Sequence, residues 1–138
     1  MRIFLDANVL FAAAQSPTGR SALLISFAKQ GQCECITSPH AITEAQRNLE
    51  AKYPHAMKSF HEVLTIVHTI QEATTNSVHW ALQQGLPEND APILAAAIQA
   101  KAEVLVTGDK THFGHLFGKT KRSVKILSLK KTLDLLLD

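Results

Sequence analysis

The sequence predicts an α/β fold with three layers, in which helices cover both faces of a mostly parallel central sheet. Short apolar, strand-like segments alternate with helix-like segments along the chain, which is typical of parallel sheets. The near-continuous β-branched run at 103–107 is typical of a strand buried on both faces. The chain has 138 residues, 46% hydrophobic and 19% charged, and no linker or repeat, which predicts a single domain over 1–138.

Apolar runs, apolar periodicity and helix start signals predict the elements in order. Strands are expected at 2–6, 33–37, 65–70, 103–107 and 124–129, the third of them on a weak alternation alone. Helices are expected at 9–14, 17–30, 39–53, 57–64, 76–84, 90–100 and 133–137. Two Ser-Pro pairs, at 16–17 and 38–39, each predict a helix start, with serine as the N-cap and proline at the first helical position. Gly31 and Gly85 should each end a helix.

Composition and charge restrict the class of protein. A net charge of +2 and a pI of about 8.6 permit a nucleic-acid partner without requiring one. No apolar run approaches the ~20 residues that span a bilayer. Asp6 also comes too early for the core of a signal peptide, so we expect a cytoplasmic protein with no membrane partner. Cys33 and Cys35 lie two apart on an expected strand, where a disulfide between them would be strained, and we interpret them as packing residues.

Four acids fall at places that a parallel sheet brings together. Asp6 ends the first expected strand, and Asp109 follows the strand at 103–107 across Gly108, which lets the backbone turn. Glu44 lies in the first turns of one expected helix, and Asp90 lies at the start of another. Ligands of such sheets bind outside the carboxyl ends of the strands. We therefore expect these four carboxylates to share one crevice.

Each acid taken alone also has a structural interpretation. Asp90 could favour a helix dipole, with Asn89 as the cap. Glu44 could pair with Arg47 on the next turn. Asp109 could form an Asx-turn after its strand. The acid at the end of the first strand is the hardest to explain in this way, because an apolar strand end is a poor place for a structural carboxylate.

Four segments, in order and spanning essentially the whole chain, resemble those of a known family. They are Phe4-Leu5-Asp6-Ala7-Asn8-Val9-Leu10, Ile42-Thr43-Glu44-Ala45, Asn89-Asp90-Ala91-Pro92-Ile93-Leu94-Ala95-Ala96-Ala97 and Val106-Thr107-Gly108-Asp109. The family is that of the PIN-domain nucleases, which includes the toxin ribonucleases of bacterial and archaeal toxin–antitoxin pairs. The resemblance implies a PIN-like fold, an RNA substrate, an antitoxin protein as a partner, and a homodimer.

The resemblance also implies roles for particular residues. It implies an acidic pocket that binds metal, directly or through water, with the ligands Asp6, Glu44, Asp90 and Asp109. It implies that Asn8 and Thr107 supply hydrogen bonds in that pocket. There are two departures: Ala7 stands where many members have threonine, and Lys110-Thr111-His112-Phe113 stands where some members place a further acid or asparagine. The second departure predicts a second metal position that is weak or is filled only with substrate.

The chemistry of clustered acids leads to the same activity. Four carboxylates around one pocket cannot all stay ionised unless cations neutralise them. Hard oxygen ligands select Mg²⁺ or Mn²⁺. Such ions activate a water and stabilise the leaving oxygen in phosphodiester hydrolysis, so no serine, cysteine or histidine nucleophile is needed. This chemistry predicts metal-dependent phosphodiester hydrolysis, and together with the resemblance it implies an endoribonuclease.

Basic residues near the last acid have two interpretations. Lys119, Lys121, Arg122 and Lys125 lie within seven residues of each other, and Lys110 lies next to Asp109. They either keep an edge strand solvated or form a rim that contacts RNA phosphates. His112 is a candidate to contact metal, phosphate or the leaving group. The other histidines have no ligand spacing shared with the acids.

Other functions make different demands on the same residues. A haloacid-dehalogenase-like phosphatase needs a second aspartate two residues after the first, where this chain has Asn8, and a response-regulator receiver needs paired acids on the first strand. The serious alternative is a catalytically silent PIN-like module that only binds RNA or protein. The four acids favour the enzyme, because a scaffold gains nothing from clustered like charges. Whether the enzyme is a toxin or a housekeeping nuclease stays open.

Overall fold

A computed structural model describes residues 1–138 and places them around one six-stranded sheet with the order β3-β2-β1-β4-β6-β5. The strands are β1 (Arg2–Leu5), β2 (Glu34–Thr37), β3 (His68–Thr69), β4 (Val104–Val106), β5 (Thr120–Lys121) and β6 (Val124–Leu127). The helices are α1 (Ala7–Gln15), α2 (Arg20–Lys29), α3 (Pro39–Lys52), α4 (Met57–Ile66), α5 (Thr75–Leu82), α6 (Ala91–Gln99), α7 (Lys110–Phe113) and α8 (Leu129–Leu137). All strand pairs are parallel except β5 with β6. The predicted α/β fold with a mostly parallel sheet is confirmed.

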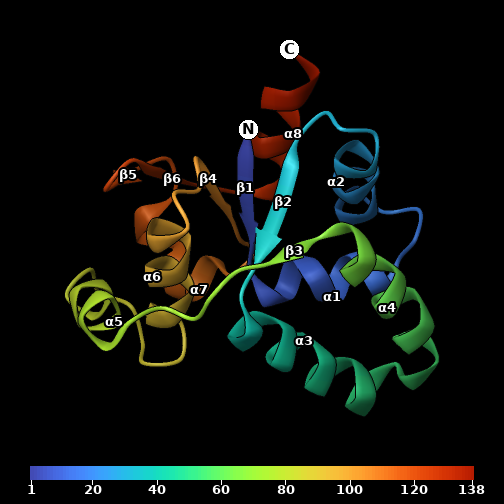
Figure 1. Ribbon diagram of the computed structural model, residues 1–138, viewed down its shortest axis with the longest axis horizontal. Helices are drawn as coiled ribbons and strands as arrows, with labels where there is room; N and C mark the ends of the chain where they lie inside the picture. Colours follow the sequence, from blue (N-terminus) through green and yellow to red (C-terminus); the bar gives the residue numbers. More distant parts are fainter.

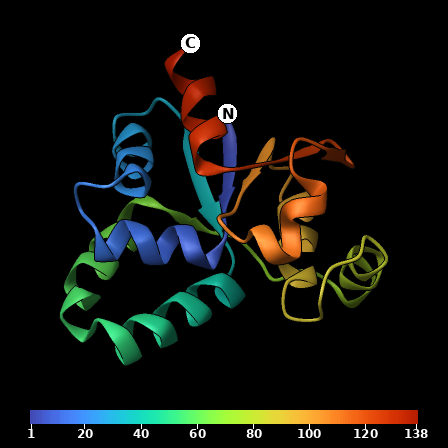
Figure 2. The ribbon, with the colours of Figure 1, turned by 180° about the vertical axis from the view of Figure 1, so that it is seen from behind.

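The helices form two groups on either side of the strands. Helices α5 and α6 pack together on one side, and α1 to α4 pack together on the other (Figures 1 and 2). Helix α8 packs against α2 and β4. The two central strands, β1 and β4, have almost no exposed side chains, and α6 is an alanine-rich helix of which most residues are buried. The two cysteines are free and buried, in agreement with their predicted packing role.

The carboxyl edge of the sheet is where the strands end and the helices begin. In the parallel register, Leu5 at the end of β1 pairs with Val106 at the end of β4, and Phe4 pairs with Ile36 of β2. Helices α1 and α3 begin directly beyond β1 and β2, so their first turns lie at this edge (Figure 1). The arrangement brings together residues that are about a hundred positions apart in the sequence.

One of the two predicted Ser-Pro helix starts is wrong. Helix α2 begins at Arg20, with Gly19 as its N-cap and no side-chain cap. Ser16 instead ends α1, because its N–H donates to the carbonyl of Ala12, and its own carbonyl accepts from the N–H of Gly19 in a turn. The second pair behaves as predicted, since the Ser38 hydroxyl oxygen accepts from the N–H of Ala41.

Several predicted boundaries shift. The strand expected at 65–70 is reduced to His68–Thr69, because α4 continues to Ile66. The last helix begins at Leu129, where Ser128 caps it. The short elements α7 and β5 were not predicted. The glycine ends of α2 and α5 are confirmed by φ values of +82° at Gly31 and +81° at Gly85. None of the helices has the length and apolarity to cross a bilayer.

Candidate active site

The four predicted acids line a single pocket of about 240 Å³ at the carboxyl edge of the sheet. They reach it from four different places: the end of β1, the second turn of α3, the start of α6 and the loop after β4. Nine residues line the pocket: Asp6, Ala7, Asn8, Phe11, Glu44, Asn48, Lys52, Asp90 and Asp109. The expectation that the carboxylates share one crevice therefore agrees with the geometry.

Asp6 is the most deeply placed of the acids, with 3% of its surface exposed. Its Oδ1 accepts from the N–H of Ala7 at 2.7 Å, which caps α1, and its Oδ2 accepts from the Thr107 hydroxyl at 2.7 Å. Burial raises the pKa of Asp6 to about 6, against the lowering effect of these two hydrogen bonds, and the nearby acids raise it further. The protein holds this carboxylate in place while disfavouring its charge.

The side chain of Asn8 ties the end of β1 to the loop after β4. Its Nδ2 lies 3.3 Å from both Asp6 Oδ2 and Thr107 Oγ1, and its Oδ1 accepts from the N–H of Gly108 at 2.8 Å. A Cβ on Gly108 would lie 3.3 Å from Asn8 Oδ1, and Gly108 is not among the residues with positive φ. Glycine is therefore suited to this position by the close approach of Asn8, rather than by the turn that the sequence suggested.

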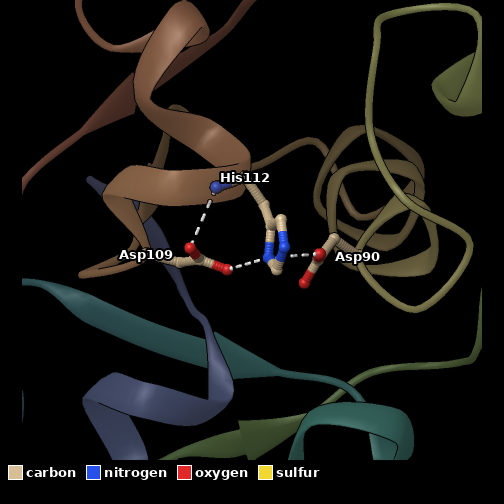
Figure 3. A group of neighbouring side chains, drawn as sticks. All are labelled: Asp90, Asp109 and His112. Atoms are coloured by element: carbon tan, nitrogen blue, oxygen red, sulfur yellow. Dashed lines mark hydrogen bonds and ion pairs between the residues drawn. The ribbon is translucent and has the colours of Figure 1, made fainter.

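His112 lies between two of the carboxylates (Figure 3). Its Nδ1 lies 2.8 Å from Asp109 Oδ2 and 3.0 Å from Asp90 Oδ2, and Asp109 Oδ1 accepts from the backbone N–H of His112. The hydrogen bond that His112 donates to the Asp109 carboxylate raises the pKa of His112. Burial raises the pKa of Asp90, and the charge of the imidazole opposes that effect. These three residues offer ligand atoms within 4.8 Å of one another.

The loop before α6 is fastened to α3 by two hydrogen bonds. Asn89 Nδ2 donates to Glu44 Oε1 at 3.1 Å, and His40 Nε2 donates to the carbonyl of Asn89 at 2.9 Å. Two of the structural interpretations are wrong, because Asn89 does not cap α6 and no ion pair joins Glu44 to Arg47, whereas Asp90 does stand at the N-cap position of α6. The tie through His40 could not be seen from ligand spacing, because it runs to a backbone carbonyl.

Asp109 keeps the structural role that its sequence position suggested. Its side chain caps α7 by accepting the N–H of His112. Asp6 likewise caps α1. Two of the four acids thus serve a helix start and face the pocket at the same time.

The predicted basic rim lies away from this pocket. In the sheet, Lys125 pairs with Val104 at the amino end of β4, and Lys121 pairs with Val124, so both lie toward the opposite edge. Arg122 is in the tight β5–β6 turn, 4.0 Å above the ring of Trp80. Lys119 lies directly before β5, the outermost strand, and does not line the pocket. Of the predicted rim, Lys110 alone adjoins an acid of the pocket, as the first residue of α7 after Asp109.

Sequence reasoning missed three residues of the pocket wall: Phe11, Asn48 and Lys52. A usable signal was present, because Glu44, Asn48 and Lys52 follow one another at i, i+4 and i+8 on α3 and so share a face of that helix. Phe11 lies four residues after Ala7 on α1, again on the pocket side.

Comparisons with known proteins agree with this arrangement. A family model described as a PIN domain matches residues 2–111. A search of curated protein sequences finds no match.

Similar solved structures share the fold at low sequence identity. PAE2754 from Pyrobaculum aerophilum has a TM-score of 0.71 at 23% identity, covering 99% of this chain and 90% of that chain. VapBC2 from Rickettsia felis, solved with a DNA fragment from its promoter, has a TM-score of 0.65 at 16% identity, covering 93% and 98%. VapC20 from Mycobacterium tuberculosis, described as a sarcin-ricin loop cleaving toxin, has a TM-score of 0.58 at 16% identity, covering 79% and 91%. With a family model that matches most of its length, the chain belongs to the PIN-domain family.

Proposed function

We propose that this protein is a metal-dependent endoribonuclease whose Asp6, Glu44, Asp90 and Asp109 hold Mg²⁺ or Mn²⁺. The observation that carries the proposal is the convergence of these four carboxylates, from four separate elements, on one pocket. Buried like charges destabilise a fold unless something neutralises them, so a cation is the natural occupant. The alternative, a catalytically silent module that binds RNA or protein, gives no reason for this convergence.

The residues present fit a hard divalent cation. The donor set consists of carboxylate oxygens, which such cations prefer, and the one nitrogen nearby is His112 Nδ1. The protein's hydrogen bonds to Asp6 orient the carboxylate without neutralising its charge. Burial and the neighbouring acids raise the pKa of Asp6, so its charged form is disfavoured, and a bound cation would offset that cost.

The roles of the chain's own residues follow from their contacts. A bound ion would supply an activated water and charge stabilisation for the leaving oxygen of a phosphodiester. Asn8 and Thr107 hold Asp6 in one rotamer, as outer partners of metal ligands commonly do. His112 positions Asp90 and Asp109 relative to each other through Nδ1.

The substrate and partners are proposed from the family. The shared fold with the sarcin-ricin loop cleaving toxin VapC20 supports RNA as the substrate. The shared fold with VapBC2, solved with a DNA fragment from its promoter, supports an antitoxin partner. We further propose that the single domain over 1–138 acts as a homodimer in the cytoplasm. The basic residues Lys110, Lys119, Lys121, Arg122 and Lys125 are proposed to contact RNA only beyond the pocket.

Removal of metal tests the proposed activity. Purified protein should cleave single-stranded or structured RNA in Mg²⁺ or Mn²⁺ and should stop in excess EDTA, because the carboxylates alone cannot activate water. Gel analysis of end-labelled RNA would give the rates, with Asp6→Asn protein as the control for contaminating nucleases. Undiminished cleavage in excess chelator would exclude the mechanism, and binding of RNA without cleavage in any divalent metal would favour the silent module.

The tie between Asn89 and Glu44 gives a second test. Asn89→Ala removes the donor that holds Glu44 Oε1, so Mn²⁺ affinity should fall by about 10-fold, the low end for loss of an outer partner of a metal ligand. Isothermal titration with Mn²⁺ would measure it. The matched control is Gln46→Ala, which removes an amide that hydrogen-bonds to Glu50 on the same helix. Equal Mn²⁺ affinities for the two variants would contradict a positioning role for Asn89.

A further inference from the structure

One wall of the acid pocket carries groups that a metal does not use. Phe11, Asn48 and Lys52 line the same pocket as the four carboxylates. Asn48 and Lys52 are exposed, and neither side chain makes a hydrogen bond or an ion pair within the protein. Their donors are therefore available to a ligand that enters the pocket.

The geometry points to a binding subsite for one unpaired nucleotide of the substrate, between α1 and α3. We propose that Phe11 stacks on its base, that the Asn48 amide hydrogen-bonds to the base or ribose, and that Lys52 contacts the next phosphate. The inference rests on the proposed ribonuclease function and extends it to the path of the RNA and to a preference for single-stranded substrate.

The spacing along α3 gives this subsite a direction. Glu44, Asn48 and Lys52 lie on successive turns, so the Cα atom of Lys52 is ~12 Å from that of Glu44 along the helix axis. The groove thus leads from the carboxylates, past an amide, to a positive charge. A phosphodiester chain with its reacting group at the carboxylates would present a neighbouring phosphate toward Lys52.

The ring of Phe11 is held in place on the other wall. It is half-buried on α1 and contacts Tyr53 edge-to-face, with ring centroids 5.8 Å apart and an interplanar angle of 64°. A ring that is already ordered can stack on a base with little further loss of side-chain freedom. Stacking is tolerant of base identity, because every base has a π-face.

Charge favours RNA over a basic protein segment in this groove. A single basic side chain would suit the carboxylates. A protein segment with several basic side chains would be repelled by Lys52, the one cation that lines the pocket. RNA fits both ends once a divalent cation neutralises the acids. In this subsite the stacking ring, Phe11, comes from α1 and the phosphate-binding cation, Lys52, comes from α3. The distant Lys121 and Lys125 do not contribute to it.

The first experiment compares Lys52 with a lysine outside the pocket. Lys52→Ala and Lys29→Ala, at the end of α2, make the same change in charge at exposed positions. In Mn²⁺, Lys52→Ala should raise KM for a short single-stranded RNA about 10-fold with kcat within twofold, whereas Lys29→Ala should change neither. Binding measured by anisotropy in the Asp6→Asn background, where turnover is removed, should show a log–log salt slope shallower by about 0.7 for loss of Lys52, the value for one phosphate of a single strand.

The second experiment tests stacking without emptying the core. Phe11→Leu keeps an apolar side chain against Tyr53 but loses the aromatic face. An RNA with one abasic position should bind about 10-fold more weakly than intact RNA in the Asp6→Asn background when that position occupies the subsite. The same abasic position should cause no further loss once Phe11 is replaced by leucine.

The outcomes separate the subsite from the activity. If the wild type cleaves RNA but the Lys52 and Lys29 variants have equal KM and equal salt slopes, the subsite is overturned and the ribonuclease stands. If the wild type does not cleave but Lys52 and Phe11 variants still lose RNA affinity as described, the activity fails and the subsite stands. If an arginine-rich peptide binds more tightly to Lys52→Ala while RNA affinity is unchanged, the groove accepts protein and the proposal is overturned.

Discussion

Replacing Asp6 with asparagine is expected to reduce RNA cleavage by several orders of magnitude. The change keeps the volume of the side chain but removes the charge that, in the proposed function, positions the cation. The amide oxygen of the new side chain could still accept the N–H of Ala7 and so cap α1, as the carboxylate does, and the fold should be retained. Single-turnover cleavage in Mg²⁺ would measure the loss, and Asp134→Asn, the same chemical change on exposed α8, should leave the rate unaltered.

The same variant should be as stable as the wild type, or more stable, in EDTA. Neutralising Asp6 relieves its desolvation and its repulsion from Glu44 and Asp90. We expect a gain of about 1 kcal/mol from a urea melt at pH 8, in line with the stability commonly recovered at strained sites, because the lost Thr107 hydrogen bond offsets part of the relief. A variant that is clearly less stable yet still active would make Asp6 a structural residue and would remove it from the proposed active site.

The metal-free protein is expected to lose stability as the pH rises. The pKa of Asp6 is about 6 in the folded state, against the ordinary aspartate value of 3.8 that applies to the unfolded chain, so folding favours the protonated form. The corresponding stability is fully present below about pH 4 and is lost as the pH rises through 6, and at about 1.36 kcal/mol per pKa unit it amounts to about 3 kcal/mol. The raised pKa values of Asp90 and His112 act in the same direction.

Urea melts in EDTA between pH 4.5 and pH 8 would measure this dependence. The Asp6→Asn protein should show a flatter profile, because the most strongly shifted carboxyl is gone. Saturating Mg²⁺ should restore stability selectively at high pH, where the carboxylates are ionised and bind it. A metal-free wild type whose stability rises with pH over this range would contradict the account of Asp6.

The parts of the fold that were predicted from sequence depend on local signals or on a general rule of sheets. A buried strand such as β4 is recognisable by its β-branched residues. The start of α3 is recognisable by its Ser-Pro pair, in which Ser38 caps the helix. The rule that parallel strands expose their carboxyl ends at one edge was sufficient to bring Asp6 and Asp109 together. Nothing beyond the order of strands and helices was needed for that part of the site.

The parts that were not predicted depend on contacts between distant residues. Ser16 has the same local signal as Ser38 but is used to end one helix instead of starting the next. The placement of the basic residues depends on a short antiparallel strand, β5, that turns the chain back along β6. The hydrogen bonds from Asn89 to Glu44 and from His40 to the carbonyl of Asn89 join segments 45 or more residues apart, and no local sequence pattern predicts them.

The sheet order also governs when the proposed active site can first form during synthesis of the chain. Strand β1 lies between β2 and β4, and the Asp6 carboxylate is held by Thr107, 101 residues later in the chain. Translation proceeds at about 5–20 residues per second, so the first acid leaves the ribosome several seconds before its hydroxyl partner and before Asp90 and Asp109. A nascent chain that still lacks β4 also lacks Thr107, which holds Asp6, and Asp109, the last of the four acids. Under the proposed function, the chain therefore stays inert beside the messenger and ribosome that produce it until nearly all of it has emerged.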